Sequence, residues 1–302
     1  MRIALLGLGK MGANMARRLL RHPMEVVGYN RSYEKTAELA QTDGLIPAQS
    51  LEEVVKLLTP PRILWLMLPS GDTTQNAIEA LLPLLKRGDL VVDGGNANYH
   101  DSMARGLQLQ QAGIDFMDAG TSGGVWGLEN GYCLMVGGSR AAVERLSPVL
   151  KVLAPSEKNG WAHVGPVGAG HFTKMIHNGI EYGMMQALAE GLALMQHKQD
   201  FKLDLAQITE LWRHGSVVRS WLLDLTAQAL DKDQVLENIA PFVPDSGEGR
   251  WTAIEAIEQG VPAPVMTLAL QMRFASQDQK SYVNRLLSMM RNAFGGHAVK
   301  KN

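Results

Sequence analysis

The stretch 3-IALLGLGKMGANMARRLL-20 decides the fold of the first half of the chain. Residues 3–6 predict a buried strand, and the amphipathic pattern over 11–20 predicts a helix. Between them lies a G-x-G-x-x-G turn, Gly7-Leu8-Gly9-Lys10-Met11-Gly12. Gly7 permits a tight turn, Gly9 lets the backbone approach a pyrophosphate at the helix N-terminus, and Gly12 lets the helix pack on the strand. We therefore predict a dinucleotide-binding unit; an ordinary glycine-rich turn is the alternative.

Short apolar runs alternate with amphipathic segments on either side of this turn. Strands are predicted at 25–29, 63–68, 90–93, 116–119, 132–137 and 162–164, and helices at 32–39, 73–85 and 102–111. This alternation predicts a largely parallel sheet with right-handed crossovers. After the Gly/Pro-rich run at 165–170, only helices are predicted, at 170–197, 205–215, 218–230, 250–259, 264–275 and 277–294. The fold class is α/β: a Rossmann-type dinucleotide-binding domain over 1–165, followed by an all-α domain over 166–302.

Composition narrows the classes of function. A chain of 302 residues favours two domains, and 46% hydrophobic with 20% charged residues favours a globular protein. Lys plus Arg number 29 and Asp plus Glu 30, so the net charge of -1 gives no support for a nucleic-acid partner. The single Cys133 excludes an internal disulfide and a cysteine zinc site. With no leader-like or membrane-spanning segment apparent, we expect a cytoplasmic protein without a membrane partner.

The end of the second strand bears on cofactor choice. An acidic residue there binds the ribose 2′-hydroxyl of NAD, whereas an Arg accommodates the 2′-phosphate of NADP. The chain has Asn30, Arg31 and Ser32 at this point and no carboxylate. Arg31 can contact a phosphate with two nitrogens, and its neighbours can add hydrogen bonds. We predict NADP, while NAD remains possible if Arg31 is only a solvated loop residue.

Polar residues interrupt the helix predicted over 170–197. Its apolar positions suggest a buried helix, and they include Phe172, Met175, Ile176, Ile180 and Met184. The polar ones fall at i, i+3, i+4, i+7 and i+8 and share one face: Lys174, His177, Asn178, Glu181 and Tyr182. A Lys and a Glu on one face form an acid/base pair that can flank a small molecule, and burial can shift the lysine pKa toward neutrality. We interpret the face as catalytic; a solvated face with a salt bridge is the alternative.

Two turns follow predicted strands at the edge where ligands bind in open α/β sheets. Asn96, after Gly94-Gly95, has the amide to contact nicotinamide or substrate. Ser122, Gly123 and Gly124 offer a hydroxyl and backbone N–H groups that can hold a carboxylate. Simple turn chemistry is the alternative for both segments.

Together these motifs resemble the β-hydroxyacid dehydrogenase superfamily and, within it, the decarboxylating 6-phosphogluconate dehydrogenase family in its shorter bacterial form. The resemblance covers residues 1–297 and rests on GLGKMG, on GGN at 94–96, on SGG at 122–124 and on KMIHNGIEY at 174–182. Gly249-Arg250-Trp251-Thr252 resembles the family's GKWT with Arg in place of Lys. The run RNAFGGH at 291–297 resembles its terminal R-x-x-F-G-x-H.

The resemblance implies oxidation of 6-phosphogluconate at C3, decarboxylation to ribulose 5-phosphate and reduction of NADP or NAD. Lys174 would be the general base and acid, and Glu181 would protonate C1 of the enediol. The implied substrate-binding residues are Asn96, Ser122, Gly123, Gly124, His177, Asn178, Tyr182, Arg250, Arg273, Arg291 and His297. The implied cofactor-binding residues are Gly7, Leu8, Gly9, Lys10, Met11, Gly12, Asn30, Arg31, Ser32 and Asn96. We expect no metal, because the β-keto acid formed by the oxidation already has an electron sink. The resemblance also implies that a homodimer, or a higher homo-oligomer, shares its active sites through the terminal segment.

Other functions remain open at this point. A 3-hydroxyacid dehydrogenase that acts on 3-hydroxyisobutyrate or tartronate semialdehyde without decarboxylation shares the SGG turn and the Lys/Asn pair. Such relatives usually lack the His-Asn and Glu-Tyr combination of residues 177–182. An imine reductase would not need the Lys/Glu face, and a dinucleotide-binding sensor without turnover would not need it either.

Overall fold

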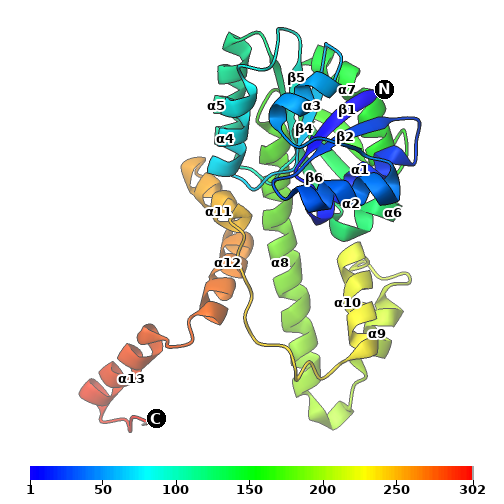
Figure 1. Cartoon of the computed structure of the whole chain (residues 1–302). Helices are drawn as coiled ribbons and strands as arrows, with labels where there is room; N and C mark the ends of the chain where they lie inside the picture. The colour runs from blue at the N-terminus through cyan, green and yellow to red at the C-terminus, as the bar shows by residue number, and fades with distance from the viewer. Residues whose placement is uncertain (301–302) are drawn as a thin grey trace. The chain divides into compact units, whose positions relative to one another are not determined.

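The computed structural model describes residues 1–300, with the backbone alone for Phe294. The chain divides into two compact units, Met1–His177 and a second unit that begins at Asn178. The long helix α8, Ala169–His197, starts in the first unit and continues into the second (Figure 1). The domain boundary predicted between residues 165 and 166 stays a prediction.

The first unit is built on an eight-stranded sheet with the order β3-β2-β1-β4-β5-β6-β7-β8. Its strands are β1 Arg2–Leu6, β2 Glu25–Tyr29, β3 Ile46–Pro47, β4 Ile63–Leu66, β5 Leu90–Asp93, β6 Asp115–Ser122, β7 Cys133–Gly137 and β8 Trp161–Gly165. All neighbouring strands are parallel except β6 and β7. The predicted Rossmann-type α/β fold, followed by a helical second part, is confirmed.

Helices cover both faces of this sheet (Figure 1). They are α1 Lys10–Leu20, α2 Tyr33–Asp43, α3 Leu51–Leu57, α4 Asp72–Leu81, α5 Tyr99–Gln111, η1 Gly124–Trp126, α6 Gly127–Asn130 and α7 Arg140–Leu153. Alternate residues of β1 face opposite sides, as the two-residue period of a strand requires. Ile3 and Leu5 pack in one core with α1 and α7, whereas Ala4 and Leu6 pack in the other with α3, α4 and α5.

Five elements of the first unit were not predicted from the sequence: β3, α3, η1, α6 and α7. Of these, α7 has the N-cap Ser139 and a buried stripe that includes Leu146. The predicted strand 116–119 is wrong at its end. The observed β6 continues to Ser122 because its last residues pair antiparallel with β7, Ser122 opposite Cys133. Ser122 is therefore a strand residue and not part of a free turn.

The second unit is helical, as predicted. After α8 come η2 Gln199–Phe201, α9 Leu205–Trp212, α10 Trp221–Lys232, α11 Glu248–Glu258, α12 Pro264–Gln277 and α13 Tyr282–Gly295. The predicted helix 277–294 is wrong at its start, because a turn at 278–281 separates α12 from α13. There the Asp278 carboxylate accepts a hydrogen bond from the Ser281 N–H (2.8 Å), and the Ser281 hydroxyl caps α13.

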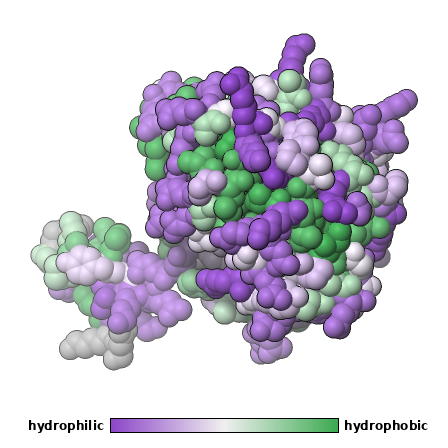
Figure 2. Space-filling view, turned by 45° about the horizontal axis from the view of Figure 1, so that its top comes forward, coloured by the Kyte–Doolittle hydropathy of each residue, from purple (hydrophilic) through white to green (hydrophobic). Residues whose placement is uncertain are grey.

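The expectation that α8 is a buried helix holds only for part of its apolar residues. Met175 is 2% exposed, whereas Ile180 is 50% exposed and Met184 46%. Figure 2 shows hydrophilic residues over most of the visible surface, with hydrophobic ones gathered in its middle. Among residues 1–300, no helix has both the length and the apolar character that crossing a membrane requires.

Candidate active site

Four strands of the first unit end at one edge of the sheet. The register aligns Leu6 of β1 with Leu66 of β4, Leu66 with Asp93 of β5, and Asp93 with Asp118 of β6. The segments after these strands therefore lie along the same carboxyl edge. This is where ligands bind in open α/β sheets, close to the point between β1 and β4 where the strand order reverses.

The glycine-rich turn after β1 has the geometry that its sequence predicts. Gly7 has a φ of +94°, and a Cβ there would lie 2.4 Å from the Met67 carbonyl oxygen. A Cβ on Gly12 would lie 2.0 Å from the Gly7 oxygen, so α1 packs directly on the turn. A Cβ on Gly9, by contrast, would meet nothing within 4 Å. The backbone before α1 is thus open on the side of Gly9, where a phosphate group can approach.

The end of β2 supports this turn and borders a cavity. The Asn30 side-chain oxygen accepts a hydrogen bond from the Leu8 N–H (3.0 Å), and its amide nitrogen donates to the Ser32 carbonyl (3.1 Å). Arg31 is exposed. A cavity of about 260 Å³ is lined by Leu8, Gly9, Lys10, Ala13, Asn14, Arg17, Lys35, Glu38, Leu39 and Val125. Three polar residues of this lining, Asn14, Arg17 and Lys35, were not predicted as site residues from the sequence. Asn14 and Arg17 lie farther along α1, and Lys35 lies in the first turn of α2.

A buried ion pair fixes the turn after β5. Asp93 and Arg105 are both buried, and their charged atoms lie 3.1 Å apart. The Asp93 carboxylate also accepts a hydrogen bond from the Gly95 N–H (3.1 Å), while Arg105 donates to the Gly71 carbonyl at the start of α4 (3.0 Å). Asn96, just beyond, is exposed at the sheet edge. This pair was not predictable from the sequence, since its members belong to different elements.

The Ser122–Gly124 segment lies over a buried tyrosine. Gly123 and Gly124 both have positive φ angles, +130° and +53°, and a Cβ on Gly123 would lie 3.3 Å from the Tyr132 ring. The ring is fully buried, and its hydroxyl has no hydrogen-bond partner among the described residues. Burial raises the pKa of Tyr132 to about 12. The phenol is therefore neutral at ordinary pH and acts as packing beneath the turn.

Asp118 of β6 holds the start of α8. Its side chain is fully buried, and its two oxygens accept hydrogen bonds from the Gly168 and His171 N–H groups, each at 2.7 Å. These N–H groups belong to the N-terminus of the helix, where the first N–H groups have no carbonyl partner within the helix. A carboxylate from a distant strand therefore caps α8 and stabilises the positive end of its dipole.

This cap places Lys174 against the sheet. A Cβ on Gly120 of β6 would lie 2.4 Å from the Lys174 Cβ, so only glycine fits below the lysine. Lys174 is buried, and its Nζ lies 3.4 Å from His177 Nδ1. The structure thus brings Lys174 and His177 together next to the carboxyl end of β6. Farther along the same helix, Asn178 is half-buried, Glu181 is exposed and Tyr182 is buried.

The second unit gathers Tyr182, Arg250 and Arg273. A Cβ on Gly249 would lie 2.4 Å from the Tyr182 ring, so the tyrosine packs on the start of α11. The Arg273 guanidinium carbon lies 3.5 Å from the centre of that ring. Arg250, also on α11, pairs with the carboxylate of Asp245, and its guanidinium lies 4.8 Å from the Phe274 ring. Two cations and a phenol from three helices therefore surround one small region.

Arg291 and His297 are not part of this group. Arg291 lies on α13 and His297 just after it; both are exposed. Within the described residues, no hydrogen bond or ion pair joins either of them to Arg250 or Arg273. The Asn292 amide donates to the His297 carbonyl (2.8 Å), which closes the chain back on the end of α13.

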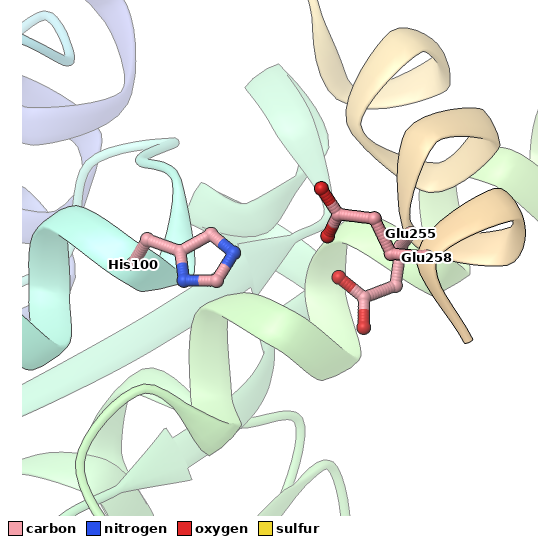
Figure 3. Close-up of side chains that lie close together, drawn as sticks. All are labelled: His100, Glu255 and Glu258. Atoms are coloured by element: carbon pink, nitrogen blue, oxygen red, sulfur yellow. The ribbon is translucent and has the colours of Figure 1, made fainter.

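Two carboxylates on α11 are candidate metal ligands. Glu255 and Glu258 lie three residues apart on this helix, and Figure 3 draws both side chains. His100, drawn in the same view, belongs to the first unit, where its ring stacks on Tyr99 with 4.0 Å between centres. Among residues 1–300, neither unit by itself brings three such ligand atoms together. The expectation that no metal takes part stays a prediction.

The sheet, the open glycine-rich turn and the helical second unit together define a protein with a Rossmann-type dinucleotide-binding fold. The sequence model for the NAD binding domain of 6-phosphogluconate dehydrogenase matches residues 2–165, and the model for the C-terminal domain of that enzyme matches residues 170–301. The chain belongs to the 6-phosphogluconate dehydrogenase family.

Individual relatives agree with this membership. The Bacillus subtilis protein YqeC is 41% identical over 301 residues, covering 100% of both chains. A Haloferax volcanii protein named as NAD(+)-dependent, decarboxylating 6-phosphogluconate dehydrogenase is 38% identical over 100% of this chain and 99% of its own. The solved Plasmodium falciparum 6-phosphogluconate dehydrogenase, studied alone, with NADP+ and with 6-phosphogluconate, has a TM-score of 0.85 and 29% identity. The present chain is covered completely and spans 66% of that longer one.

Proposed function

We propose that this protein oxidises 6-phosphogluconate at C3 and releases CO2 to give ribulose 5-phosphate, while a nicotinamide dinucleotide is reduced. Family membership supports the reaction, as does the naming of the Haloferax relative for it. The observation that carries the proposal is Lys174, a buried lysine seated on Gly120 at the carboxyl edge of a dinucleotide-binding sheet. A 3-hydroxyacid dehydrogenase without decarboxylation remains the second candidate, because it uses the same lysine.

The residues at the glycine-rich turn fit a dinucleotide. The open space over Gly9, the N-terminus of α1 and the cavity beside them accept a pyrophosphate and an adenosine. Arg31 at the end of β2 and Lys35 at the cavity can bind a 2′-phosphate, so we propose that NADP is preferred and that NAD is also accepted. When bound, the dinucleotide would supply the acceptor for the hydride that leaves C3 of the substrate.

The chain's own groups then handle protons and charge. Neutral Lys174 takes the proton of the C3 hydroxyl, and its ammonium form polarises the C3 ketone as CO2 leaves. His177, 3.4 Å from Lys174, and Asn178 orient the substrate hydroxyls. Glu181, on the same helical face as Lys174, protonates C1 of the enediol. Asn96 and the Ser122–Gly124 segment hold the nicotinamide and the carboxylate end of the substrate.

The basic group of the second unit suits a sugar phosphate. We propose that Tyr182, Arg250 and Arg273 bind the phosphate, since guanidinium groups match its oxygens with paired hydrogen bonds. Arg291 and His297 would complete the site of a second copy of the chain. Homodimerisation is supported by the large apolar residues exposed on α8, α12 and α13, which include Ile180, Met184, Val265, Leu268, Val283 and Leu287. In this proposal, residues 1–165 bind the cofactor, and residues 166–302 bind substrate and form the dimer.

One assay tests the reaction. The purified protein is incubated with 6-phosphogluconate and NADP or NAD, and reduced nicotinamide and CO2 are both measured. Equal amounts of the two products are expected. Reduced nicotinamide without CO2 would favour the 3-hydroxyacid dehydrogenase, and neither product with either cofactor would refute the proposal.

Lys174→Met is the matched test of the mechanism. It should abolish turnover while cofactor affinity stays nearly the same, because the side chain is similar in size but has no titratable nitrogen. Lys198→Met, at an exposed lysine paired with Asp200, is the control and should keep activity. Near-normal turnover in Lys174→Met would rule out the assigned role.

A further inference from the structure

A short segment of the second unit joins the three residues proposed to bind the phosphate. Residues 243–247, called the strap below, run along α12 before α11 begins. The Val243 N–H donates to the Ser276 hydroxyl (3.0 Å), and the Gln277 side-chain amide donates to the Val243 carbonyl (2.8 Å). Arg273 Nη1 donates to the Pro244 carbonyl (2.9 Å). The strap is thereby attached to α12 and holds Arg273.

Asp245 is the central residue of the strap. Its side chain is only 2% exposed. One carboxylate oxygen accepts hydrogen bonds from the Gly247 N–H (3.1 Å) and from the Tyr182 hydroxyl (3.4 Å). The other accepts from Arg250 Nε. Asp245 therefore contacts two of the proposed phosphate-binding residues directly, and the strap that carries it contacts the third.

The way in which Arg250 is held leaves it ready for a ligand. Asp245 binds its Nε, and the guanidinium lies over the Phe274 ring at 4.8 Å. The side chain nevertheless remains 56% exposed. A long arginine side chain loses much rotamer freedom when it binds a ligand, and prior anchoring removes that cost from the binding step.

We propose that Asp245 is a positioning residue that orients Arg250 toward a phosphate ester, and so sets the preference for a phosphorylated sugar acid over its unphosphorylated form. The inference rests on the proposed function, which supplies the substrate.

Two effects of Asp245 oppose each other. Its negative charge weakens the attraction of an anion, whereas its hydrogen bond fixes the orientation of Arg250. Because Arg250 is more than half exposed, water screens the charge effect and the orientation effect dominates.

Asp245→Asn separates the two effects. An asparagine can still accept the hydrogen bonds from Gly247 and Tyr182, but its NH2 group faces Arg250 Nε. Two donors then face each other, and Arg250 loses the hydrogen bond that orients it. We expect the KM for 6-phosphogluconate to rise about tenfold, equivalent to about 1.4 kcal/mol, with kcat changed less than about twofold. The KM for NADP should not change. Inhibition by inorganic sulfate should weaken by a similar factor, and KM for gluconate should not rise.

The matched control is Asp224→Asn, which removes another Nε–carboxylate pair, Arg213–Asp224 at 2.8 Å, from the same unit. It should leave the KM for 6-phosphogluconate unchanged. A lower KM or tighter sulfate inhibition in Asp245→Asn would show that the charge effect dominates, and would overturn the proposal. An unchanged KM, or a fall in kcat alone, would overturn it as well.

A double-mutant cycle tests whether Asp245 acts through Arg250. Arg250→Ala should raise the KM by itself, and adding Asp245→Asn should then have no further effect. A persistent tenfold increase in the Arg250→Ala background would indicate a general structural role and refute the inference. If Asp245→Asn does not fold, Ser276→Ala loosens the other end of the strap and should raise the KM about threefold; an unchanged KM would contradict the proposal.

Failure of the inference can be distinguished from failure of the proposed function. Wild-type protein without turnover of 6-phosphogluconate would refute the function. Calorimetric titration of 6-phosphogluconate or sulfate into wild type and Asp245→Asn still measures the strap's effect, and equal affinities in the two proteins would refute the inference. Wild-type protein that binds neither probe would refute both.

Discussion

Removing the Asp118 carboxylate is the most direct test of how the first unit positions Lys174. Asp118 accepts two hydrogen bonds of 2.7 Å from the N-terminus of α8, and its side chain is fully buried. Hydrogen bonds to a charged group are each worth about 1.5–3 kcal/mol. Asp118→Ala leaves the Gly168 and His171 N–H groups buried without the carboxylate, but it also removes the cost of burying a charge. We therefore expect the free energy of unfolding to fall by about 3 kcal/mol.

Asp118→Asn should cost less, about 2 kcal/mol, because the amide can accept one of the two hydrogen bonds but must turn its NH2 group toward the other donor. Both variants should also slow turnover of 6-phosphogluconate. A displaced helix start moves Lys174, only three residues beyond His171, and a misplacement of about 1 Å can cost about a hundredfold in rate.

Urea unfolding followed by circular dichroism gives the global change. Hydrogen exchange of the Gly168 and His171 amides gives the local change, and both amides should exchange much faster in the variants. Asp115→Asn is the control on the same strand, because the Asp115 side chain is 48% exposed and its ion pair with Arg145 is long, at 3.6 Å between the charged atoms. It should cost less than about 1 kcal/mol. An Asp118→Ala protein that matches this control in stability and exchange would refute the capping role.

Four further predictions concern the same unit. Gly9→Ala should keep the melting temperature within about 2 °C, because a Cβ there meets no atom within 4 Å, yet weaken dinucleotide binding at least about tenfold in calorimetry. Gly120→Ala should lower kcat more than about tenfold at unchanged cofactor affinity, since its Cβ would overlap Lys174; an unchanged kcat would contradict the packing seen here. Arg31→Ala and Lys35→Ala should each raise the KM for NADP about fivefold and leave that for NAD unchanged, and equal effects on both would argue against 2′-phosphate recognition. Tyr132 keeps its proton in the folded state up to a pKa of about 12, whereas the unfolded chain loses it near 10, so stability should fall between these pH values. Tyr132→Phe should flatten that fall in urea unfolding curves measured against pH.

The sequence by itself determined the features that depend on local order. The G-x-G-x-x-G turn needs only a strand before it and a helix after it, so the tight turn at Gly7 and the close packing at Gly12 followed from spacing alone. The role of Gly9 toward a pyrophosphate stays a prediction. The shared face of Lys174 and Glu181 likewise follows from the helical period. The strand-to-helix alternation sufficed for the fold class.

Only the tertiary structure decided the residues that support the site. Asp118 caps a helix 50 residues farther along the chain, and Asp93 pairs with Arg105 across a loop and a helix. Asp245 accepts a hydrogen bond from Tyr182, which lies 63 residues earlier in the chain. Each is an ordinary acidic residue in the sequence, because what distinguishes it is the partner that chain folding brings within hydrogen-bond distance. The exposure of Ile180 and Met184 could not be predicted from the sequence either, since a periodic pattern shows which residues share a helix face but not what covers it.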